Sequence, residues 1–318
     1  MCIRHEIRKL VIYSLKHVSS DIVHYTLSPF HEPRIKVKPG ETVVVETLDA
    51  LGGVVTEETP FEKLIKEGKL PEFFNPVSGP IYVEGAEPGD TLVVEITDIK
   101  VSGLGVTVNV PGFGGLRTPY LQKELPPITK ISKIEDNIIH FPLKNGKIVK
   151  IPVKPLVGTI GVAPRIEAQL SIKPDRHGGN MDCPDITVGN KLYLPVFVSG
   201  ALLYMGDVHA AQGEGEISGV AVEVSAEVTV KLDVLKGKSI NWPRVESPTE
   251  LITICSSASL NHAVRLAFTE LVLWLEEDYG LDRMDAYMLC SQVAGCRLSQ
   301  IVNPRYTITS RFPKEFLP

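Results

Sequence analysis

The chain has 318 residues, enough for one large domain or two ordinary ones, and 43% of the residues are hydrophobic while 22% are charged. The net charge of -5 leaves no basic excess of the kind that a nucleic-acid surface requires. No hydrophobic run approaches the roughly 20 residues of a membrane-spanning helix, and no hydrophobic signal-peptide segment follows the charged N-terminus. We therefore expect a soluble protein that has neither nucleic acid nor a membrane as a partner.

Cysteine usage indicates a reducing compartment. The five cysteines are odd in number and scattered, and no two of them form a Cys-x-x-Cys pair. This spacing predicts neither a disulfide framework nor a thiolate zinc site. We expect a cytoplasmic protein.

Strand patterns dominate the first part of the chain. Residues 6–30 alternate weakly and predict one or two strands, and a Pro-Gly turn at residues 39–40 precedes a β-branched strand over residues 42–48. The same turn and strand recur over residues 86–98. We therefore expect two similar β elements in one sandwich or barrel.

The middle of the chain mixes turn signals with further strands. Residues 60–69 predict a short helix that starts at a proline and stops at a glycine, and the many glycines of residues 103–118 predict a mobile loop. Residues 138–151 predict a hairpin that turns at Asn145-Gly146. Residues 218–235 alternate throughout and predict one long strand, with its valines on one face and residues such as Glu223 on the other.

The character of the sequence changes after residue 255. Apolar residues at helical spacing predict a helix over residues 259–279 that stops at Gly280. A second helix is predicted from the N-cap Asp282 to near Gly295. No linker is visible. We expect a single α+β domain over residues 1–318, with a β-rich sandwich- or barrel-like core in residues 1–250 and two C-terminal helices, in residues 255–300, packed on it.

The strongest candidate site lies between His177 and Glu216, where strand-like runs alternate with clusters of acids, histidines and glycines. Asp207 and His209 are two residues apart, so an extended backbone would place both side chains on one face. Glu214 and Glu216 repeat that spacing. Oxygen and imidazole ligands on one face suit a divalent metal, and a cluster of acids requires a cation or bound protons. The alternative interpretation is a strand with an exposed polar face.

Three further candidates are weaker. The segment from His177 to Asp182, which includes Asn180, is either a site loop or a glycine-rich turn. Asp49 is either a ligand or a turn residue. Cys183 would be a nucleophile only with a lowered pKa, and the sequence offers no adjacent basic residue or helix N-terminus, so we interpret it as a buried thiol.

Several long segments carry a resemblance to a known family. The segments 83–90, 158–164, 177–182, 206–216 and 286–304 resemble the signature segments of the acetamidase/formamidase family, and the likeness covers nearly the whole chain. The resemblance implies a β-rich fold, hydrolysis of short aliphatic amides such as formamide and acetamide to carboxylate and ammonia, a divalent-metal site and a homodimer or higher homo-oligomer.

The chemistry of amide hydrolysis then suggests roles for the matching residues. We expect Asp182, Asp207 and His209 to hold the metal, with Asp49 as a further candidate ligand in a matching Leu-Asp-x-x-Gly-Gly segment. The catalytic candidates are Glu214 or Glu216 as general base, and Asn180 and His177 as groups that orient the amide.

The identity of the metal stays open at this point. Zinc is the expected ion, while the ligand types also suit Mn or Fe, and a carboxylate-rich site suits Ca. Two other classes also stay open: a cysteine-dependent amidase that uses Cys183, and a non-catalytic β protein that binds a metal or a small ligand.

Overall fold

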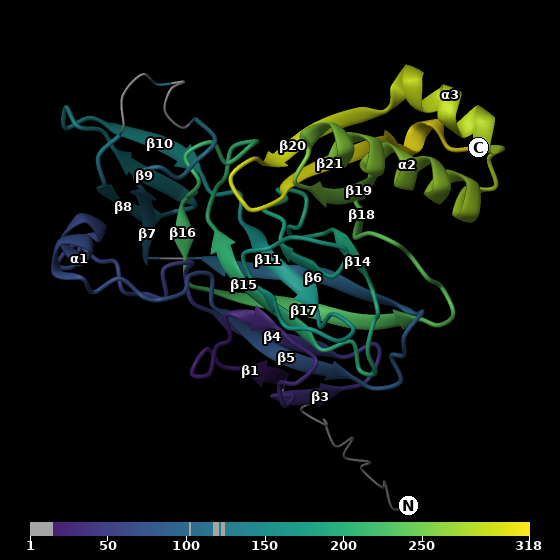
Figure 1. Cartoon of the computed structure of the whole chain (residues 1–318), viewed down its shortest axis with the longest axis horizontal. Coiled ribbons are helices and arrows are strands. Elements are labelled where there is room, and N and C mark those ends of the chain that lie inside the picture. Colours follow the sequence, from purple (N-terminus) through teal and green to yellow (C-terminus); the bar gives the residue numbers. More distant parts are fainter. Residues whose placement is uncertain (1–14, 102, 117–120, 122–124) are drawn as a thin grey trace, which may run out of the picture.

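The computed structural model describes residues 15–101, 103–116, 121 and 125–318 (Figure 1). Most of the strands in this part of the chain belong to two large open β-sheets, which confirms the expected β-rich fold class. The first sheet has nine strands in the order β1 (Lys16–Val18), β4 (Thr42–Thr47), β17 (Ala226–Leu235), β6 (Thr91–Val101), β14 (Lys191–Pro195), β18 (Arg244–Glu246), β19 (Glu250–Ser257), β21 (Tyr306–Pro313) and β20 (Gly295–Gln300).

The second sheet has ten strands and contains the centre of the molecule. Its main path runs in the order β10 (Ile148–Pro152), β9 (Ile138–Pro142), β8 (Ile128–Glu135), β7 (Gly103–Asn109), β16 (Glu223–Val224), β15 (Leu203–His209), β11 (Leu156–Val162) and β13 (Gly178–Asn180). Off this path, β5 (Val77–Val83) pairs with β15 and with β3 (Ile35–Val37). A separate two-stranded sheet joins β2 (Thr26–Leu27) to β12 (Gln169–Leu170).

The main hydrophobic core lies between the two large sheets. Val45 and Ile96 from the first sheet belong to the same buried cluster as Ile160 and Met205 from the second. Strand β4 alternates between buried and partly exposed residues, as a strand with one covered face does. In contrast, β11 and β15 are buried at every position, so both of their faces are covered. Any polar side chain on β15 is therefore held away from bulk water.

The repeated turn-and-strand unit of the sequence is confirmed. Its two strands are β4 and β6, and both pair antiparallel with β17, one on each side. The predicted hairpin is also confirmed, since β9 and β10 pair antiparallel around a turn that contains Gly146 with φ +79°. At the N-terminal end, β1 and β2 are the strands expected within residues 6–30, and residues 6–14 of that prediction lie outside the described part of the chain.

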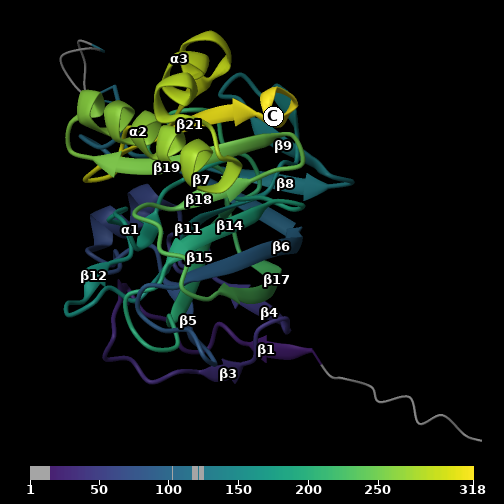
Figure 2. The ribbon, with the colours of Figure 1, turned by 90° about the vertical axis from the view of Figure 1, so that its right-hand side faces the viewer.

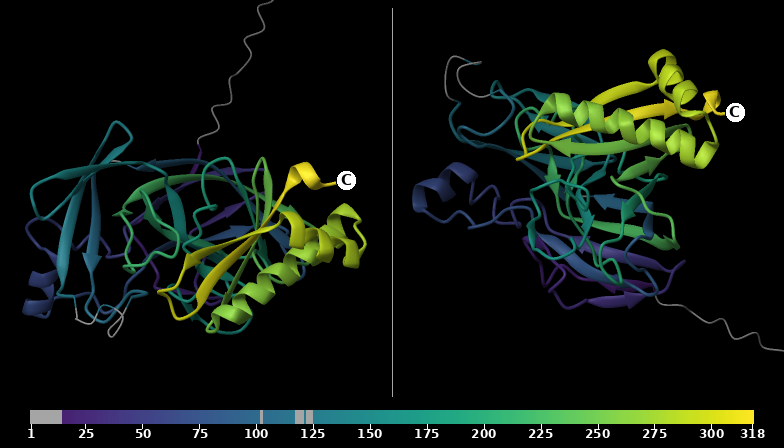
Figure 3. Two further views of the ribbon diagram at one scale, coloured as in Figure 1. Left: turned by 90° about the horizontal axis from the view of Figure 1, so that it is seen from above. Right: turned by 45° about the vertical axis from the view of Figure 1, so that its right-hand side comes forward.

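All three predicted helices are present. Helix α1 (Phe61–Glu67) follows Pro60 and ends at Gly68, while α2 (Leu260–Tyr279) begins at the N-cap Ser259 and α3 (Arg283–Val293) at the N-cap Asp282. A short 3-10 helix, η1 (Lys314–Phe316), ends the described chain. Helices α2 and α3 pack together over β19 and β21, far from α1 (Figures 2 and 3). No helix of the described residues is long and apolar enough to cross a membrane.

Two local predictions were wrong. The glycine-rich residues 103–118 are not a continuous loop, because Gly103–Asn109 forms β7. Val106 and Val108 are buried at alternate positions of this strand, and the glycines around them obscured that alternation in the sequence. Residues 117 and 118 lie outside the described part. Residues 218–235 are not one strand either. The chain leaves the second sheet after β16 and enters the first sheet with β17, so the alternation continues through Ser225 while the pairing partners change.

Candidate active site

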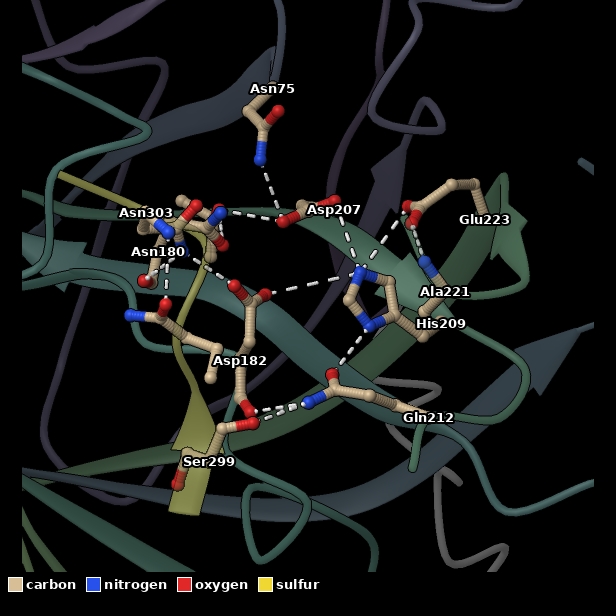
Figure 4. A network of polar contacts seen from close by, with 12 residues as sticks. Asn75, Asn180, Asp182, Asp207, His209, Gln212, Ala221, Glu223, Ser299 and Asn303 are labelled. Atoms are coloured by element: carbon tan, nitrogen blue, oxygen red, sulfur yellow. Dashed lines mark hydrogen bonds and ion pairs between the residues drawn. The ribbon is translucent and has the colours of Figure 1, made fainter. Parts of the chain in front are cut away.

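Five ionisable side chains meet inside the protein where β15 and β16 pair, and Figure 4 shows four of them, Asp182, Asp207, His209 and Glu223. Asp207 and His209 come from the end of β15, and Glu223 comes from β16, directly opposite His209 in the register. Asp182 follows β13, and Glu216 belongs to the loop that leads toward β16. The exposed fraction of each residue is 7% or less. The structure therefore concentrates four acids and one histidine in a nearly dry environment, which is costly unless a cation or protons balance the charge.

Strained backbone places three of the acids. Asp182, Asp207 and Glu216 have φ values of +45°, +55° and +44°, in the left-handed region that non-glycine residues seldom adopt. Such conformations each cost about 1–3 kcal/mol and persist where the surrounding structure imposes them, often at functional sites. Asp207 is thus not in regular strand geometry, yet its Oδ1 lies 3.3 Å from His209 Nε2. The expected proximity of these two side chains is therefore present.

A glycine on the neighbouring strand makes room for the acids. Gly158 of β11 lies between register pairs that flank Asp207. A Cβ atom built on Gly158 would lie 2.7 Å from Asp182 Oδ1 and 2.9 Å from Asp207 Oδ2, closer than Cβ atoms approach other atoms. Only glycine therefore permits both carboxylates to approach this point without a shift of the backbone.

Each of the two aspartates uses one oxygen as an anchor and presents the other to His209. Asp207 Oδ2 accepts a hydrogen bond from Asn75 Nδ2 at 2.8 Å and lies 3.1 Å from the Thr159 hydroxyl, whose single proton also faces Asn180 Oδ1 at 2.8 Å. Asp182 Oδ2 accepts from Asn303 Nδ2 at 2.6 Å, while its Oδ1 accepts no hydrogen bond and lies 4.0 Å from His209 Nε2. The hydrogen bonds to the two Oδ2 atoms thus fix the orientation of both carboxylates.

In Glu223 and His209 as well, one side-chain atom is anchored by a hydrogen bond and another is directed into the cluster. Glu223 Oε1 accepts from the Ala221 backbone N–H, whereas the buried Oε2 accepts no hydrogen bond and lies 3.3 Å from His209 Nε2. Gln212 Nε2 donates to two backbone carbonyls, which turns Gln212 Oε1 toward His209 Nδ1 at 2.9 Å. Because that oxygen can only accept, Nδ1 carries a proton and Nε2 is the nitrogen available to a ligand.

The electrostatics of the cluster follow from burial and from the crowding of like charges. Burial, reinforced by the charge of Asp207, raises the pKa of Asp182 to about 7, and burial raises the pKa of Glu223 to about 8. Burial and the charge of Asp182 raise the pKa of Glu216 well above its usual range. Burial alone would lower the pKa of His209, but the charges of Glu223 and Asp207 raise it well above the ordinary value. One imidazolium therefore faces four acids.

The donor atoms fit a divalent metal ion. Three carboxylate oxygens surround Nε2 at 3.3, 3.3 and 4.0 Å, and a single N–H cannot donate to all of them. Ligands placed tetrahedrally around one Zn²⁺ at 2.0–2.1 Å lie roughly 3.3 Å from one another. Two overlapping ligand groups share His209: Asp182 with Glu216, and Asp207 with Glu223. The buried acids and His209 can therefore hold a metal.

A cavity of about 440 Å³ opens onto this cluster. Asp207, Glu216 and Glu223 line it, together with Asn180. Asn180 Oδ1 accepts from the Thr159 hydroxyl at 2.8 Å, so its amide NH₂ is the part that remains for a molecule in the cavity. Asp182 and His209 do not line the cavity and lie beneath its floor.

The structure does not bring four other candidates to this position. Glu214 is exposed and pairs with Arg297 at 3.1 Å, because residues 212–215 are not a strand and the i, i+2 spacing does not place Glu214 beside Glu216. Asp49 Oδ1 accepts from the backbone N–H groups of Leu51 and Gly53, so Asp49 stabilises a turn near the cavity.

His177 and Cys183 are both buried and do not line the cavity. Burial lowers the pKa of His177 to about 4, so its imidazole is neutral at pH 7. Burial raises the pKa of the Cys183 thiol above its usual range, and Asp185 adds to this effect. A nucleophilic thiolate at Cys183 therefore has no structural support.

The sequence reasoning missed several residues of the site. Glu223 escaped notice because it fits the alternating pattern of residues 218–235, in which acids occupy the outward positions. Asn75 and Asn303 are distant in the sequence and carry no local signal. Gln212 and Gly158 lie within segments that were singled out, and the combination of a histidine with an amide three residues later was the available signal for Gln212.

Comparison with known proteins gives a consistent result. The model of the Acetamidase/Formamidase family matches residues 18–170 and 165–317. A crystal structure of an acetamidase from Yersinia enterocolitica shares 36% identity with a TM-score of 0.88, over 96% of this chain and 93% of that one. An acetamidase from Bacillus halodurans shares 34% identity with a TM-score of 0.86, over 94% of this chain and 98% of that one.

Matches to curated relatives are shorter. A formamidase from Methylophilus methylotrophus is 28% identical in an alignment of 252 positions that covers 63% of this chain and 61% of that protein. The matched region spans between 53% and 62% of the lengths of the curated relatives.

Proposed function

This chain belongs to the acetamidase/formamidase family, and we propose that it hydrolyses primary amides to a carboxylate and ammonia at the buried acidic cluster. The observation that carries the proposal is the convergence of anchored side chains on one point. Asp182, Asp207 and Glu223 each use one oxygen for a hydrogen bond and direct the other toward His209 Nε2. A set of ligands held in place before a cation binds is what a metal-dependent hydrolase requires.

Asp207 and His209 would hold the metal ion with Glu223, which belongs to the same ligand group, and Asp182, from the second group that shares His209, would be a further donor. A divalent ion bound there would supply Lewis-acid chemistry by lowering the pKa of water and polarising a carbonyl group. Zinc suits the mixture of carboxylate and imidazole ligands best, and Mn, Fe or Ca is the alternative. We leave Asp49 out of the ligand set because it belongs to neither group of side chains whose donor atoms lie within 4.8 Å of one another.

The residues that face the cavity would handle the substrate. The NH₂ group of Asn180 is placed to donate a hydrogen bond to the amide carbonyl oxygen, since Thr159 occupies its Oδ1. Glu216 lines the cavity, and its pKa is raised well above the usual range by burial and by Asp182. A carboxyl group whose protonated form is stabilised in this way is suited to take up a proton and return it during a reaction.

The proposed reaction balances with these groups. Glu216 takes a proton from a water molecule while the water oxygen bonds to the amide carbon. Glu216 then returns a proton to the amide nitrogen, the C–N bond breaks, and ammonia leaves. The carboxylic acid that remains gives its proton to the ammonia or to solvent, and the carboxylate product is released. Glu214 is too exposed to act as this base, and His177 does not line the cavity.

Ammonia release from formamide, acetamide and propionamide, measured with the metal content of the same sample, tests the proposal. We expect release that a chelator abolishes and that added Zn²⁺ or Mn²⁺ restores. The Cys183→Ala variant is the matched control and is expected to retain full activity. Release that survives complete metal removal would contradict the proposal and favour a thiol mechanism, and bound metal without turnover would favour a non-catalytic binding protein.

Two wider expectations accompany this function. The family resemblance implies a homodimer or larger homo-oligomer, which light scattering would measure. The four described cysteines are free thiols, which supports a reducing cytoplasmic location.

A further inference from the structure

The cavity beside the acidic cluster has two chemically different kinds of lining side chain. Asp207, Glu216, Glu223 and Asn180 are polar, and the part of the cavity at these residues is called its inner end. The remaining walls are largely apolar and include Tyr25, Phe73, Phe74, Phe113, Leu170 and Val220. A substrate that reacts at the inner end would therefore extend its remaining atoms along apolar walls.

Several apolar side chains of the cavity walls are exposed to solvent, which indicates a surface for a ligand. Phe73, Phe113 and Leu170 have exposed fractions of 45%, 36% and 43%, although each could be buried by a small movement of its loop or by a ligand. The rings of Tyr25 and Phe73 lie 5.8 Å apart, which gives this wall an aromatic surface. Single exposed apolar residues are ordinary, but several gathered at one cavity mark a binding site.

The size of the cavity exceeds the needs of the smallest amides. A volume of about 440 Å³ falls in the range of pockets that bind drug-sized ligands, roughly 300–1,000 Å³. Acetamide carries only a methyl group on its carboxamide, so it would fill the inner end and leave the apolar walls in contact with water. Filling those walls with an apolar group would add favourable burial.

The charge of the lining restricts the substrate further. Glu72 lines the cavity together with the cluster acids, while no lysine or arginine occurs among the described lining residues. A carboxylate on the distal part of a substrate would therefore find no basic side chain in the lining to pair with. The lining disfavours a negatively charged substrate.

We infer that the site takes primary amides that carry no carboxylate and whose acyl chain ends in an apolar group of aryl size, with the carboxamide at the acidic cluster and the apolar group against the wall that includes Tyr25, Phe73 and Phe113. This inference deepens the proposed function and rests on it. Phe73 would act on specificity through contact with the distal group of the substrate and would take no part in the chemistry.

The test compares kcat/KM for acetamide, phenylacetamide and succinamate with the metal-loaded protein. Burying an aryl group in the cavity should raise kcat/KM for phenylacetamide roughly 10- to 100-fold above that for acetamide. Succinamate, which carries a carboxylate in place of the ring, should be the poorest substrate. Phe73→Ala should lower the ratio of phenylacetamide to acetamide about 3- to 10-fold. Phe316 has the same exposed fraction of 45% at the far C-terminal end, so Phe316→Ala is the matched control and should leave the ratio unchanged.

The outcomes separate this inference from the function on which it rests. Hydrolysis of acetamide with an equal or lower kcat/KM for phenylacetamide would overturn the inference and leave the amidase proposal in place. A preference for succinamate, or an unchanged ratio in Phe73→Ala, would overturn it as well. A metal-loaded protein that releases ammonia from none of the three amides would overturn the proposed function itself.

Discussion

Two buried groups of charged residues in this protein invite comparison. The first is the acidic cluster around His209. The second lies beneath α2, where Arg244 of β18 is 2% exposed, sits 3.7 Å from Glu270 and 3.6 Å from Glu277, and stacks over the Trp274 ring at 5.1 Å. Both groups contain buried atoms that lack a hydrogen-bond partner, among them Asp182 Oδ1 in the first and Arg244 Nε in the second.

The two groups differ in charge balance and in access. Positive and negative charges face one another around Arg244, and Arg244 does not line the cavity described above. In the acidic cluster, four acids face one histidine, their free oxygens converge, and a cavity opens onto them. Burial of charge alone therefore does not identify a functional site. An excess of one sign beside an accessible cavity does.

The largest expected effect separates the two groups by activity. Asp207→Asn should remove the bound metal and lower kcat/KM for acetamide at least about a thousand-fold, equivalent to roughly 4 kcal/mol of transition-state stabilisation. The metal-free variant should unfold in urea more easily than metal-free wild-type protein, because the carboxylate that pairs with His209, and whose pKa this pairing holds below its usual value, is gone. Metal stoichiometry that matches the wild type would contradict this assignment.

A substitution in the second group, the one around Arg244, should affect stability and leave activity unchanged. Arg244→Met leaves Glu270 buried without its partner and should lower the free energy of unfolding by about 3–5 kcal/mol. Metal content and the kcat/KM of the folded protein should stay at wild-type values. The double variant with Glu270→Leu should recover much of the stability, since no lone charge remains. Loss of metal in Arg244→Met would show that the two groups are not independent.

His177 is a third buried ionisable side chain, and it belongs to neither of the two groups. Burial, chiefly, lowers the pKa of His177 from the ordinary 6.5 to about 4 in the folded protein. Between pH 6.5 and 4, the unfolded chain therefore binds a proton that the folded chain does not. The free energy of unfolding is unaffected by this proton above pH 6.5 and falls as the pH drops from 6.5 to 4. The total fall is about 3 kcal/mol.

Urea unfolding as a function of pH measures this contribution. His177→Gln should flatten the fall of stability between pH 6.5 and 4 relative to the wild type. His262 is exposed in the first turn of α2, so His262→Gln is the control and should reproduce the wild-type slope. Identical slopes in all three proteins would show that His177 is protonated equally in the folded and unfolded states.

The smallest expected effect concerns the orientation of His209. Gln212→Met keeps the side-chain length but removes the acceptor for Nδ1 and both bonds to backbone carbonyls. Metal affinity should fall about 10- to 100-fold, and kcat at saturating metal should change little. A competition titration against a chelating dye measures the dissociation constant. An unchanged constant would mean that the ligands alone orient the imidazole.

Local patterns predicted the elements well where neighbours in the sequence are also neighbours in space. The N-cap Ser259 and the terminal Gly280 delimit α2 within one residue of the predicted bounds, and the spacing of Asp207 and His209 correctly brought their side chains together. The same spacing failed for Glu214 and Glu216, because Gly215 has φ +86° and the chain turns there.

The rest of the site depends on tertiary structure. The alternation around Glu223 is the same whether residues 218–235 form one strand or pass between two sheets, so only the pairing of β16 with β15 reveals that Glu223 is buried beside His209. The anchors Asn75 and Asn303 lie in loops more than 100 residues from the acids that they hold, and no local pattern links such positions.

The central claim is that anchored acids around His209 form a metal site, and binding of Zn²⁺ to chelator-treated protein tests it most directly. Calorimetric titration of the wild type should show tight, saturable binding. Asp182→Asn removes the acid whose Oδ1 is buried without a partner and should abolish that binding or weaken it by orders of magnitude. Equal Zn²⁺ affinity in the wild type and Asp182→Asn, or no binding by the wild type, would contradict the account.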